Sequence, residues 1–372
     1  MTGRKPFKPV RKIRAAVYRQ QGTALTIEPV EIEGPLEHEV LVRVAAAGIC
    51  HTDIGYADDW GTVQPVILGH EGAGMVVEAG KKVKRLVPGD HVVLSYGFCG
   101  ECSPCRRGRP AECRNLMELN FGFSRLDGSS AYGSGVHGHF FCQSSFATYS
   151  LATERNSVKV PGNLPLRVLA PLGCGMQTGA GTVMNSLAVS AGSTIAVFGT
   201  GSVGLAAVMA ARIVGAAKII GIDIVPARLK LAGKLGATHL IDARLEDVST
   251  AIRKITGKGI DYSVETTDDD DMFGLALGLL NPRGKAALLS GRSGPKSLPG
   301  GRKALSVIQG DADPQIFIPK LTELYRAGLF PFDRLEKFYR FAEINKAMED
   351  SRKGRTVKPV LLFGSSMPSN RL

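Results

Sequence analysis

The pattern of apolar and polar residues changes near the middle of the chain. In the first half, short apolar runs at residues 40–44, 74–78 and 91–94 are separated by glycine- and proline-containing segments. Short β-prone runs between turn residues are typical of antiparallel sheets and barrels. This half of the chain therefore predicts a partly open, β-barrel-like domain.

A strand–helix alternation begins at about residue 182. We expect strands at residues 194–198, 218–223, 239–242 and 261–265, with helices at residues 202–214, 226–235 and 248–256 between them. Alternation of this kind predicts a parallel, doubly wound sheet covered by helices, so the predicted fold class is α/β. From about residue 317 the pattern is mostly helical, with a closing strand at residues 360–363.

One long uncharged stretch raises the question of a membrane. Residues 168–211 are 44 positions without a charged side chain, which is long enough to span a bilayer. Gly, Ser, Thr and Asn recur throughout it, and it contains a phosphate-loop pattern, so we expect a buried helix, strand and helix instead. No apolar segment follows the basic N-terminus, and we expect neither a secretory signal nor a membrane span, but a cytoplasmic protein.

Composition and charge leave few other classes open. The 372 residues are 44% hydrophobic and 22% charged, which is typical of a globular protein of about two domains. The net charge of +12 is scattered along the chain, so we do not expect nucleic-acid binding. A basic surface would instead attract anionic cofactors and acidic substrates.

Four of the seven cysteines are clustered. Cys99, Cys102, Cys105 and Cys113 follow a C-x2-C-x2-C-x7-C spacing, with Gly100, Pro104 and Gly108 in the short connecting loops. Four thiolates can close a tetrahedral shell around one Zn²⁺, and a shell without a vacancy predicts a structural site. The odd number of cysteines, without a signal peptide, argues against a disulfide framework.

A second set of metal-ligand residue types is dispersed along the chain. Cys50, His70 and Cys174 lie in the glycine-rich segments GICHTD, GHEG and GCG. Two thiolates and one imidazole would give a catalytic zinc three protein ligands and one open position. Each residue alone has an ordinary structural explanation, so this prediction depends on its combination with the next motif.

The third motif is a glycine-rich loop between a predicted strand and a predicted helix. Gly199, Gly201 and Gly204 give the pattern G-x-G-x-x-G, and Asp223 ends the following strand. Backbone N–H groups at the start of the helix would hold a pyrophosphate. Asp223 would accept hydrogen bonds from the ribose hydroxyls and repel a 2′-phosphate, which favours NAD over NADP.

With these motifs in this order, the sequence resembles the zinc-dependent medium-chain alcohol dehydrogenases. The resemblance covers residues 13 to 363. The segments that carry it are AAAGICHTD, PVILGHEGAG, CGECSPCRRGRPAEC, PLGCGMQTGAG and VFGTGSVGLAA. The segments HFFCQSSFATYSLA and FIPKLTELYRAGLFPFDRLEKFYRFAEINKAMEDSRKG are most similar to aryl (benzyl-type) members. The resemblance implies a GroES-like catalytic domain at residues 1–181 with the structural zinc lobe. It also implies a Rossmann NAD-binding domain at residues 182–316 and a C-terminal return to the catalytic domain at residues 317–372.

The resemblance also implies roles for individual residues. Cys50, His70 and Cys174 match the catalytic zinc ligands, with Glu71 behind the metal, Asp53 orienting the histidine and Thr52 contacting the substrate oxygen. The implied cofactor contacts are His51, Gly199, Gly201, Val203, Gly204, Asp223, Arg228 and Lys358. The expected complement is therefore two Zn²⁺ ions per chain and NAD. The family further implies a homodimer or homotetramer.

The expected reaction is the reversible oxidation of a primary aryl or allylic alcohol to the aldehyde, with hydride transfer to NAD. Ser95, Trp60, Phe140 and Phe141 are candidate pocket residues, for which ordinary core packing is an equal alternative. Thiol-dependent formaldehyde dehydrogenase and nicotinoprotein alcohol dehydrogenase are the enzymatic alternatives. The non-enzymatic alternative is a sensor or structural protein that binds NAD and zinc.

Two positions depart from the family pattern. Gly55 stands where many members carry a relay histidine, so we expect the substrate proton to leave through water or buffer. The acidic run at residues 268–271 lies close to where the family packs the adenine ring. We interpret that run as the start of a helix, which acidic residues favour. The seventh cysteine, Cys142, is expected to be a passive buried thiol.

Overall fold

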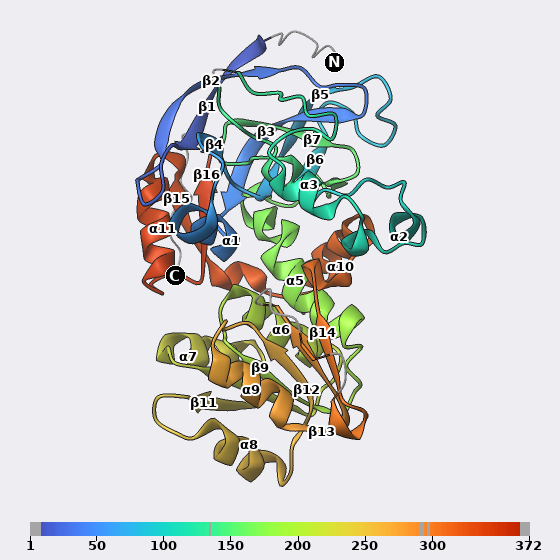
Figure 1. Cartoon of the computed structure of the whole chain (residues 1–372), viewed down its shortest axis with the longest axis vertical. Coiled ribbons are helices and arrows are strands. Elements are labelled where there is room, and N and C mark those ends of the chain that lie inside the picture. The colour runs from blue at the N-terminus through green and yellow to red at the C-terminus, as the bar shows by residue number, and fades with distance from the viewer. Residues whose placement is uncertain (1–8, 134, 290–293, 296–297, 365–372) are drawn as a thin grey trace. The chain divides into compact units, whose positions relative to one another are not determined.

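The computed structural model describes residues 9–133, 135–289, 294–295 and 298–364. The chain divides into two compact units (Figure 1). The first comprises Met1–Cys174, Asp313–Thr322 and Leu335–Leu372, and the second comprises Gly175–Ala312 and Glu323–Arg334. Within the described part of the chain, no helix is long and apolar enough to cross a bilayer.

The first unit is built mainly from β-structure. Its strands are β1 (Pro9–Tyr18), β2 (Thr26–Glu33), β3 (Glu39–Gly48), β4 (Val66–Ile67), β5 (Glu71–Ala79), β6 (His91–Leu94), β7 (Tyr149–Thr153), β8 (Ser157–Lys159), β15 (Glu336–Arg340) and β16 (Lys358–Leu362). They form a seven-stranded sheet in the order β15-β16-β3-β5-β6-β8, with β7 also on β3, and a three-stranded sheet β2-β1-β4. Because β3 and β5 are buried along most of their lengths, they form the centre of this GroES-like unit.

The helices of the first unit are short. They are α1 (His51–Gly55), the π-helix η1 (Tyr56–Trp60), α2 (Ser103–Arg106), α3 (Leu116–Phe121), α4 (Leu166–Leu169) and α11 (Ile344–Arg352). A longer helix, α10 (Pro314–Arg326), belongs to this unit up to Thr322 and to the second unit from Glu323. Several of the first unit's short helices begin or end beside a cysteine. Cys50 is the N-cap residue of α1, and Cys102 is the N-cap residue of α2. The helix ends therefore present sulfur atoms at fixed positions.

The second unit is a parallel sheet with helices against it. Its elements are α5 (Gly175–Gly181), β9 (Thr194–Phe198), α6 (Ser202–Ile213), β10 (Lys218–Asp223), α7 (Pro226–Leu235), β11 (His239–Asp242), α8 (Val248–Thr256), β12 (Ile260–Glu265), α9 (Asp270–Gly278), β13 (Leu280–Leu288) and β14 (Lys303–Ser306). The strand order is β11-β10-β9-β12-β13-β14, with every pair parallel. Numbered from β9, this is the order 3-2-1-4-5-6 of the Rossmann fold. Helices α6 to α9 pack on these strands (Figure 1).

The order reversal lies at β9, which is buried between β10 and β12. Ligands of such sheets bind outside the carboxyl ends of the strands at this switch point. The loop after β9 is the predicted phosphate loop, so the fold brings that motif to the expected edge. The uncharged stretch at residues 168–211 folds as expected, with α5, β9 and the first part of α6 within it.

Candidate functional site

The dispersed ligand set comes together in the first unit. Cys50 precedes α1, His70 precedes β5 and Cys174 follows a short 3-10 helix, yet their ligand atoms and that of Glu71 lie within 4.8 Å of one another. His70 and Glu71 are fully buried, and Cys174 is 7% exposed. Cys50 is half-buried. One nitrogen and two sulfur donors at this separation suit zinc, which binds such ligands at about 2.0–2.3 Å.

The histidine is oriented by a buried carboxylate. Asp53 Oδ1 lies 2.9 Å from His70 Nδ1 and accepts a hydrogen bond from the backbone of Gly69 at 3.0 Å. Asp53 Oδ2 accepts from the backbone of Cys50 at 2.9 Å, so one side chain fixes two of the donors. The other ring nitrogen, His70 Nε2, is buried and has no hydrogen-bond partner among the described residues. An unpartnered donor atom aimed into a cluster of sulfur atoms is the arrangement that a metal ion completes.

The electrostatics of the cluster also call for a cation. A hydrogen bond shared with Cys174 lowers the pKa of Cys50 well below its ordinary value, against the effect of burial. Burial lowers the pKa of His70, but the charges of Asp53 and Cys50 together raise it well above its usual range. The hydrogen bond with Cys50 and burial raise the pKa of Cys174. The cluster therefore stabilises one thiolate and a positive charge beside it, which a bound metal would supply.

Behind this cluster lies a buried ion pair. Lys358 Nζ contacts both carboxylate oxygens of Glu71, at 2.9 and 3.0 Å, and donates to the carbonyl of Ile49 at 3.2 Å. Both side chains are at most 1% exposed. A Cβ on Gly48 would collide with the Glu71 carboxylate, so only glycine permits this approach. Burial raises the pKa of Glu71, and Lys358 opposes that effect.

This contact differs from the role predicted for Lys358. Its ammonium group is engaged with Glu71 and Ile49 instead of being presented to a cofactor phosphate. The pyrophosphate contact of Lys358 therefore stays a prediction, and in the structure its ammonium group is paired with the Glu71 carboxylate, which lies in the metal-ligand cluster. Glu71 lies where it was expected, within the metal-ligand cluster.

The helix after Cys50 carries the predicted substrate contact. Thr52 Oγ1 lies 3.9 Å from Cys50 Sγ and is partly exposed, while the neighbouring His51 is exposed. Three residues further on, Gly55 faces the indole of Trp60, whose Nε1 lies 2.8 Å from the position of a Cβ on that glycine. The indole therefore occupies the space that a side chain at position 55 would fill.

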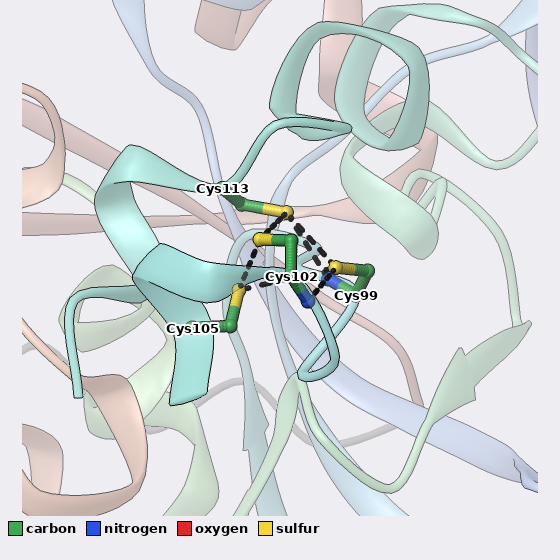
Figure 2. A group of neighbouring side chains, drawn as sticks. All are labelled: Cys99, Cys102, Cys105 and Cys113. Carbon is green, nitrogen blue, oxygen red and sulfur yellow. Dashed lines mark hydrogen bonds between the residues drawn. The ribbon is translucent and has the colours of Figure 1, made fainter. Parts of the chain in front are cut away.

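The second metal cluster is the tetracysteine lobe, drawn in Figure 2. Neighbouring sulfur atoms of Cys99, Cys102, Cys105 and Cys113 lie 3.4–4.0 Å apart. Four thiolates at about 2.3 Å from one zinc ion would be about 3.8 Å apart, so the set fits a closed tetrahedral shell. Hydrogen bonds from the backbone of Arg114 and Cys105 lower the pKa of Cys102 to about 6, which favours the thiolate.

The predicted phosphate loop joins β9 to α6. Gly199 has a φ of +86°, and a Cβ on Gly204 would collide with the Gly199 carbonyl, so both positions require glycine. Gly201 is the N-cap residue of α6 and borders open space, which leaves room for a phosphate group. Val203 lies in the first turn of that helix. The loop thus presents a helix N-terminus, which attracts anions.

Asp223 lies at the end of β10, beside this loop. Its Oδ2 accepts hydrogen bonds from the backbone and hydroxyl of Thr200, at 2.7 and 2.8 Å. Its Oδ1 accepts from the backbone of Ile224 and Val225, at 2.8 and 2.9 Å. Arg228 follows in α7, where its Nε is buried without a hydrogen-bond partner among the described residues.

The acidic run is a helix start, as predicted. Asp269 is the N-cap residue of α9, and its side chain accepts from the backbone of Asp271 and Met272, at 3.0 Å each. Asp270 and Asp271 occupy the first turn, where the helix dipole favours negative charge.

The four candidate pocket residues have different environments. Ser95 is fully buried and donates to the carbonyl of Gly173 at 2.8 Å, so its hydroxyl braces the backbone before Cys174. Phe140 is fully buried, Phe141 stacks on His70 with centroids 4.4 Å apart, and Trp60 is 46% exposed.

Cys142 donates to the carbonyl of Leu119 at 3.1 Å, and burial raises its pKa to about 12, as a passive thiol requires.

Two contributors near the metal cluster were not predicted. Gln143 is fully buried, accepts from the backbone of Gly72 at 3.0 Å and donates to the carbonyl of His70 at 2.9 Å. Phe121 of α3 contacts Phe141 with ring centroids 5.1 Å apart. Gln143 lies in the segment HFFCQSSFATYSLA but carried no predicted role, and Phe121 lies outside the quoted segments. Only the fold brings Gln143 to the His70 backbone and Phe121 to the ring that stacks on His70.

Comparison with known proteins gives consistent similarities. The family described as "Alcohol dehydrogenase GroES-like domain" matches residues 36–162, and the family described as "Zinc-binding dehydrogenase" matches residues 202–309. The chain is 44% identical to geraniol dehydrogenase of Castellaniella defragrans, over 94% of this chain and 97% of that protein. The crystal structure of benzyl alcohol dehydrogenase from Acinetobacter calcoaceticus is 42% identical, with a TM-score of 0.92, over 95% of this chain and all of that one. The structure of an "Alcohol dehydrogenase zinc-binding domain protein" from Burkholderia ambifaria is 49% identical, also with a TM-score of 0.92, over 95% of this chain and all of that one.

Proposed function

Because the chain belongs to the zinc-dependent medium-chain alcohol dehydrogenase family, we propose that it oxidises a primary aryl or allylic alcohol to the aldehyde, reversibly, with NAD. The observation that carries this proposal is the convergence of half-buried Cys50 with buried His70 and Cys174, where His70 Nε2 has no hydrogen-bond partner among the described residues. Three protein donors leave one coordination position for a substrate, whereas the tetracysteine lobe leaves none.

The chemistry is divided between the metal and the chain. Zinc held by Cys50, His70 and Cys174 would supply Lewis acidity, which lowers the pKa of an alcohol hydroxyl. Asp53 contacts the His70 ring at Nδ1 and fixes its orientation, so that Nε2 stays directed at the metal position when substrates exchange. Thr52 Oγ1, close to Cys50 Sγ, is placed to accept a hydrogen bond from the substrate hydroxyl and to pass its proton onward.

The proposed cofactor is NAD. It would accept the hydride, while the chain supplies binding and orientation. The loop Gly199–Gly204 and the start of α6 would bind the pyrophosphate, and Asp223 would contact the ribose hydroxyls. A carboxylate held rigidly by four hydrogen bonds disfavours the extra phosphate of NADP.

The side chains beside the zinc ligands support an aryl or allylic substrate. Phe141 stacks on His70, and Phe140 contacts its edge with centroids 5.6 Å apart. Planar, apolar substituents pack well against aromatic rings. The names of the two similar enzymes, geraniol dehydrogenase and benzyl alcohol dehydrogenase, describe an allylic and an aryl alcohol, which agrees with this environment.

We propose that the substrate proton leaves through water. Gly55 offers no titratable side chain, and the Trp60 indole that occupies its space cannot accept a proton. The rate of hydride transfer should therefore respond to buffer concentration. A rate that ignores buffer but titrates with an imidazole-like pKa would contradict this route.

The first test is NADH formation from NAD and benzyl alcohol by zinc-loaded protein, with geraniol as the allylic substrate. We expect turnover with both and little with NADP, and no turnover in Cys174→Ser or His70→Ala. Activity only with formaldehyde and glutathione would instead support a thiol-dependent formaldehyde dehydrogenase. Reduced cofactor that copurifies and does not exchange would support a nicotinoprotein, and no turnover with NAD and both metals bound would support a binding protein.

The assembly we propose is a homodimer or homotetramer. Strand β14 is the terminal strand of the six-stranded sheet among the described residues, and we propose this edge of the sheet as the contact between copies. Native mass spectrometry of the zinc-loaded protein would give the number of chains. A monomer at micromolar concentration would contradict this proposal.

A further inference from the structure

A row of aromatic rings begins at the metal ligand His70. Phe141 stacks on its imidazole, with centroids 4.4 Å apart and an interplanar angle of 24°. Phe121 meets Phe141 edge to face at 5.1 Å, and Trp60 meets Phe121 at 5.8 Å. We call Phe141, Phe121 and Trp60 the aromatic row.

Exposure increases along the aromatic row. Phe141 is 7% exposed, Phe121 is half-buried and Trp60 is 46% exposed. Trp60 is the only tryptophan of the chain. The row therefore leads from buried His70 to an aromatic side chain that solvent and small molecules can reach.

The middle ring is held by a helix that the tetracysteine lobe helps to place. Helix α3 begins three residues after Cys113, and the backbone of Leu116 donates to the carbonyl of Cys113 at 3.0 Å. Asn120, next to Phe121, is 2% exposed and anchors α3 to Gly97. Its Oδ1 accepts from the Gly97 backbone at 2.8 Å, and its Nδ2 donates to the Gly97 and Leu116 carbonyls at 2.9 and 2.7 Å.

These anchors join α3 to both ends of the cysteine motif. Gly97 lies two residues before Cys99, so Asn120 ties α3 to the segment that enters the lobe. Leu119, one residue earlier, accepts the thiol hydrogen of Cys142, and Cys142 directly follows Phe141. The position of Phe121 against Phe141 is thus set by buried contacts of the two residues that precede it, Leu119 and Asn120.

From this arrangement we propose that Phe121 determines specificity by binding the planar apolar part of the alcohol, and that Asn120 is the residue that positions it. The inference rests on the proposed function and deepens it, because it assigns substrate selectivity to α3 instead of to the zinc ligands. An alcohol with a ring or double bond would contact Phe121 and Trp60, whereas ethanol is too short to gain from them. The tetracysteine lobe then contributes to selectivity through the helix it anchors.

The first experiment replaces Phe121 in the zinc-loaded enzyme. In Phe121→Ala we expect the KM for benzyl alcohol to rise about tenfold with kcat within about twofold, and the constants for ethanol to stay within about twofold. Phe121→Tyr should keep the wild-type ratio, since the ring remains. The matched control is Phe363→Leu, because Phe363 is also half-buried and stacks on one ring, Phe341, outside the aromatic row.

A second readout needs neither cofactor nor turnover. Emission from Trp60 should change saturably with benzyl alcohol, and the dissociation constant should weaken about tenfold in Phe121→Ala but not in Phe363→Leu. Asn120→Asp keeps the acceptor for the Gly97 backbone and loses both donors. It should shift the Trp60 emission and lower selectivity for benzyl alcohol over ethanol, with kcat for ethanol retained.

The outcomes separate this inference from the proposed function. If wild-type protein forms NADH from benzyl alcohol but Phe121→Ala keeps the same selectivity and dissociation constant, the inference is wrong and the function stands. If wild-type protein forms no NADH, the proposed function fails, and the fluorescence titration alone decides the inference. The inference would be overturned if wild-type emission showed no saturable change, or if wild type and Phe121→Ala had equal dissociation constants for benzyl alcohol. Weaker binding of benzyl alcohol by Phe121→Ala would support it.

Discussion

At the scale of single residues, the metal cluster depends on charges that are buried in pairs. Lys358 and Glu71 lie directly behind the donors, and neither has more than 1% of its side chain exposed. Two charges removed from water stabilise each other only while both remain, because an unpaired buried ion keeps its full desolvation cost. The sequence separates them by 287 positions, so only the closing strand β16, paired with β3, brings them together.

The Lys358→Met variant should therefore lose about 3–5 kcal/mol of its free energy of unfolding. Urea denaturation of the zinc-loaded protein would measure this loss. The double variant Lys358→Met, Glu71→Gln should recover much of it, because no unpaired charge is left. Lys353→Met removes an exposed ion pair with Glu349 and should cause no measurable change. A loss below about 1 kcal/mol in Lys358→Met would show that Glu71 finds another partner or a proton.

A second buried group makes stability depend on pH. Burial lowers the pKa of His139 to about 3, and Arg125 adds to the effect while Asp127 opposes it. Its Nε2 accepts a hydrogen bond from the backbone of Ala131 at 3.1 Å, which requires the neutral ring. In the unfolded chain the ring titrates near 6.5, so between pH 6.5 and 3 the unfolded state binds the extra proton.

The contribution of His139 is fully present above pH 6.5, and it falls by about 1.4 kcal/mol for each pH unit below that value. In His139→Gln, which keeps an acceptor but cannot titrate, this slope should be absent. The measurement is the difference in free energy of unfolding between variant and wild type, taken at several pH values from about 7 to 5. Using the difference cancels the acid lability of the metal sites, which both proteins share. A difference that stays constant with pH would mean that His139 does not titrate in this range.

At the scale of elements, the ends of two neighbouring strands carry matched carboxylates with different surroundings. Asp223 ends β10 and Asp242 ends β11, and the two are paired in register. Asp223 is buried beside the phosphate loop, whereas Asp242 forms an ion pair with Arg244. Of these two carboxylates, only Asp223 should form hydrogen bonds with the ribose of a cofactor.

We expect Asp223→Ser to weaken NAD binding about tenfold, because hydrogen bonds from the ribose hydroxyls to a charged acceptor are lost. The same change should increase use of NADP, since the carboxylate no longer repels a 2′-phosphate. Calorimetric titration with both cofactors would measure the two constants. Asp242→Ser is the matched control and should leave the ratio of NAD to NADP affinity unchanged; an equal change in both variants would contradict the role of Asp223.

The same scale shows what the sequence could predict. Strands β9, β10 and β11 have the predicted bounds. The apolar runs of β9 and β10 are almost entirely buried, as is typical of parallel strands covered on both faces, whereas β11 is the terminal strand and its Leu240 is 41% exposed. Strand β13 was not predicted, since its first half contains Pro282, Arg283 and Gly284, which are typical of turns, and Arg283 has a φ of +64°. The pairing with β12 shifts register across these residues, from Ile260–Leu280 to Tyr262–Lys285, so the strand accommodates them as an irregularity between its two paired parts.

The candidate site also has parts that the sequence predicts and parts that it does not. The cysteine and histidine ligands were predictable because metal chemistry permits few residue types at few spacings. Gly55 was singled out in the sequence, but the indole that fills its space was not, since it comes from a π-helix five residues later. Phe121 carried no signal at all, because an aromatic residue in a short helix is ordinary until tertiary packing places it against Phe141, the ring that stacks on His70.

At the scale of the whole molecule, the two metal centres should differ in what they hold together. The catalytic ligands project from or adjoin β-structure and buried turns that have their own apolar core, in which the residues around His70 pack closely. The tetracysteine lobe has little regular structure, since α2 has four residues and its small apolar cluster consists largely of the cysteines themselves. A lobe of this kind depends on its metal for its fold.

Cys174→Ser and Cys113→Ser should therefore each lose about one of two zinc ions, with different consequences. Cys174→Ser should lose turnover but keep the unfolding temperature within about 3 °C, because the surrounding strands persist. Cys113→Ser should lower that temperature by roughly 10 °C, since the loss of a structural metal costs several kcal/mol. Cys113→Ser should also shift the fluorescence emission of Trp60, because α3, which carries Phe121, begins three residues after Cys113.

Zinc content by atomic emission spectroscopy, with calorimetry on the same samples, tests both variants. Equal thermal losses would mean that the catalytic metal also supports the fold, and an unshifted Trp60 in Cys113→Ser would separate the lobe from the aromatic row.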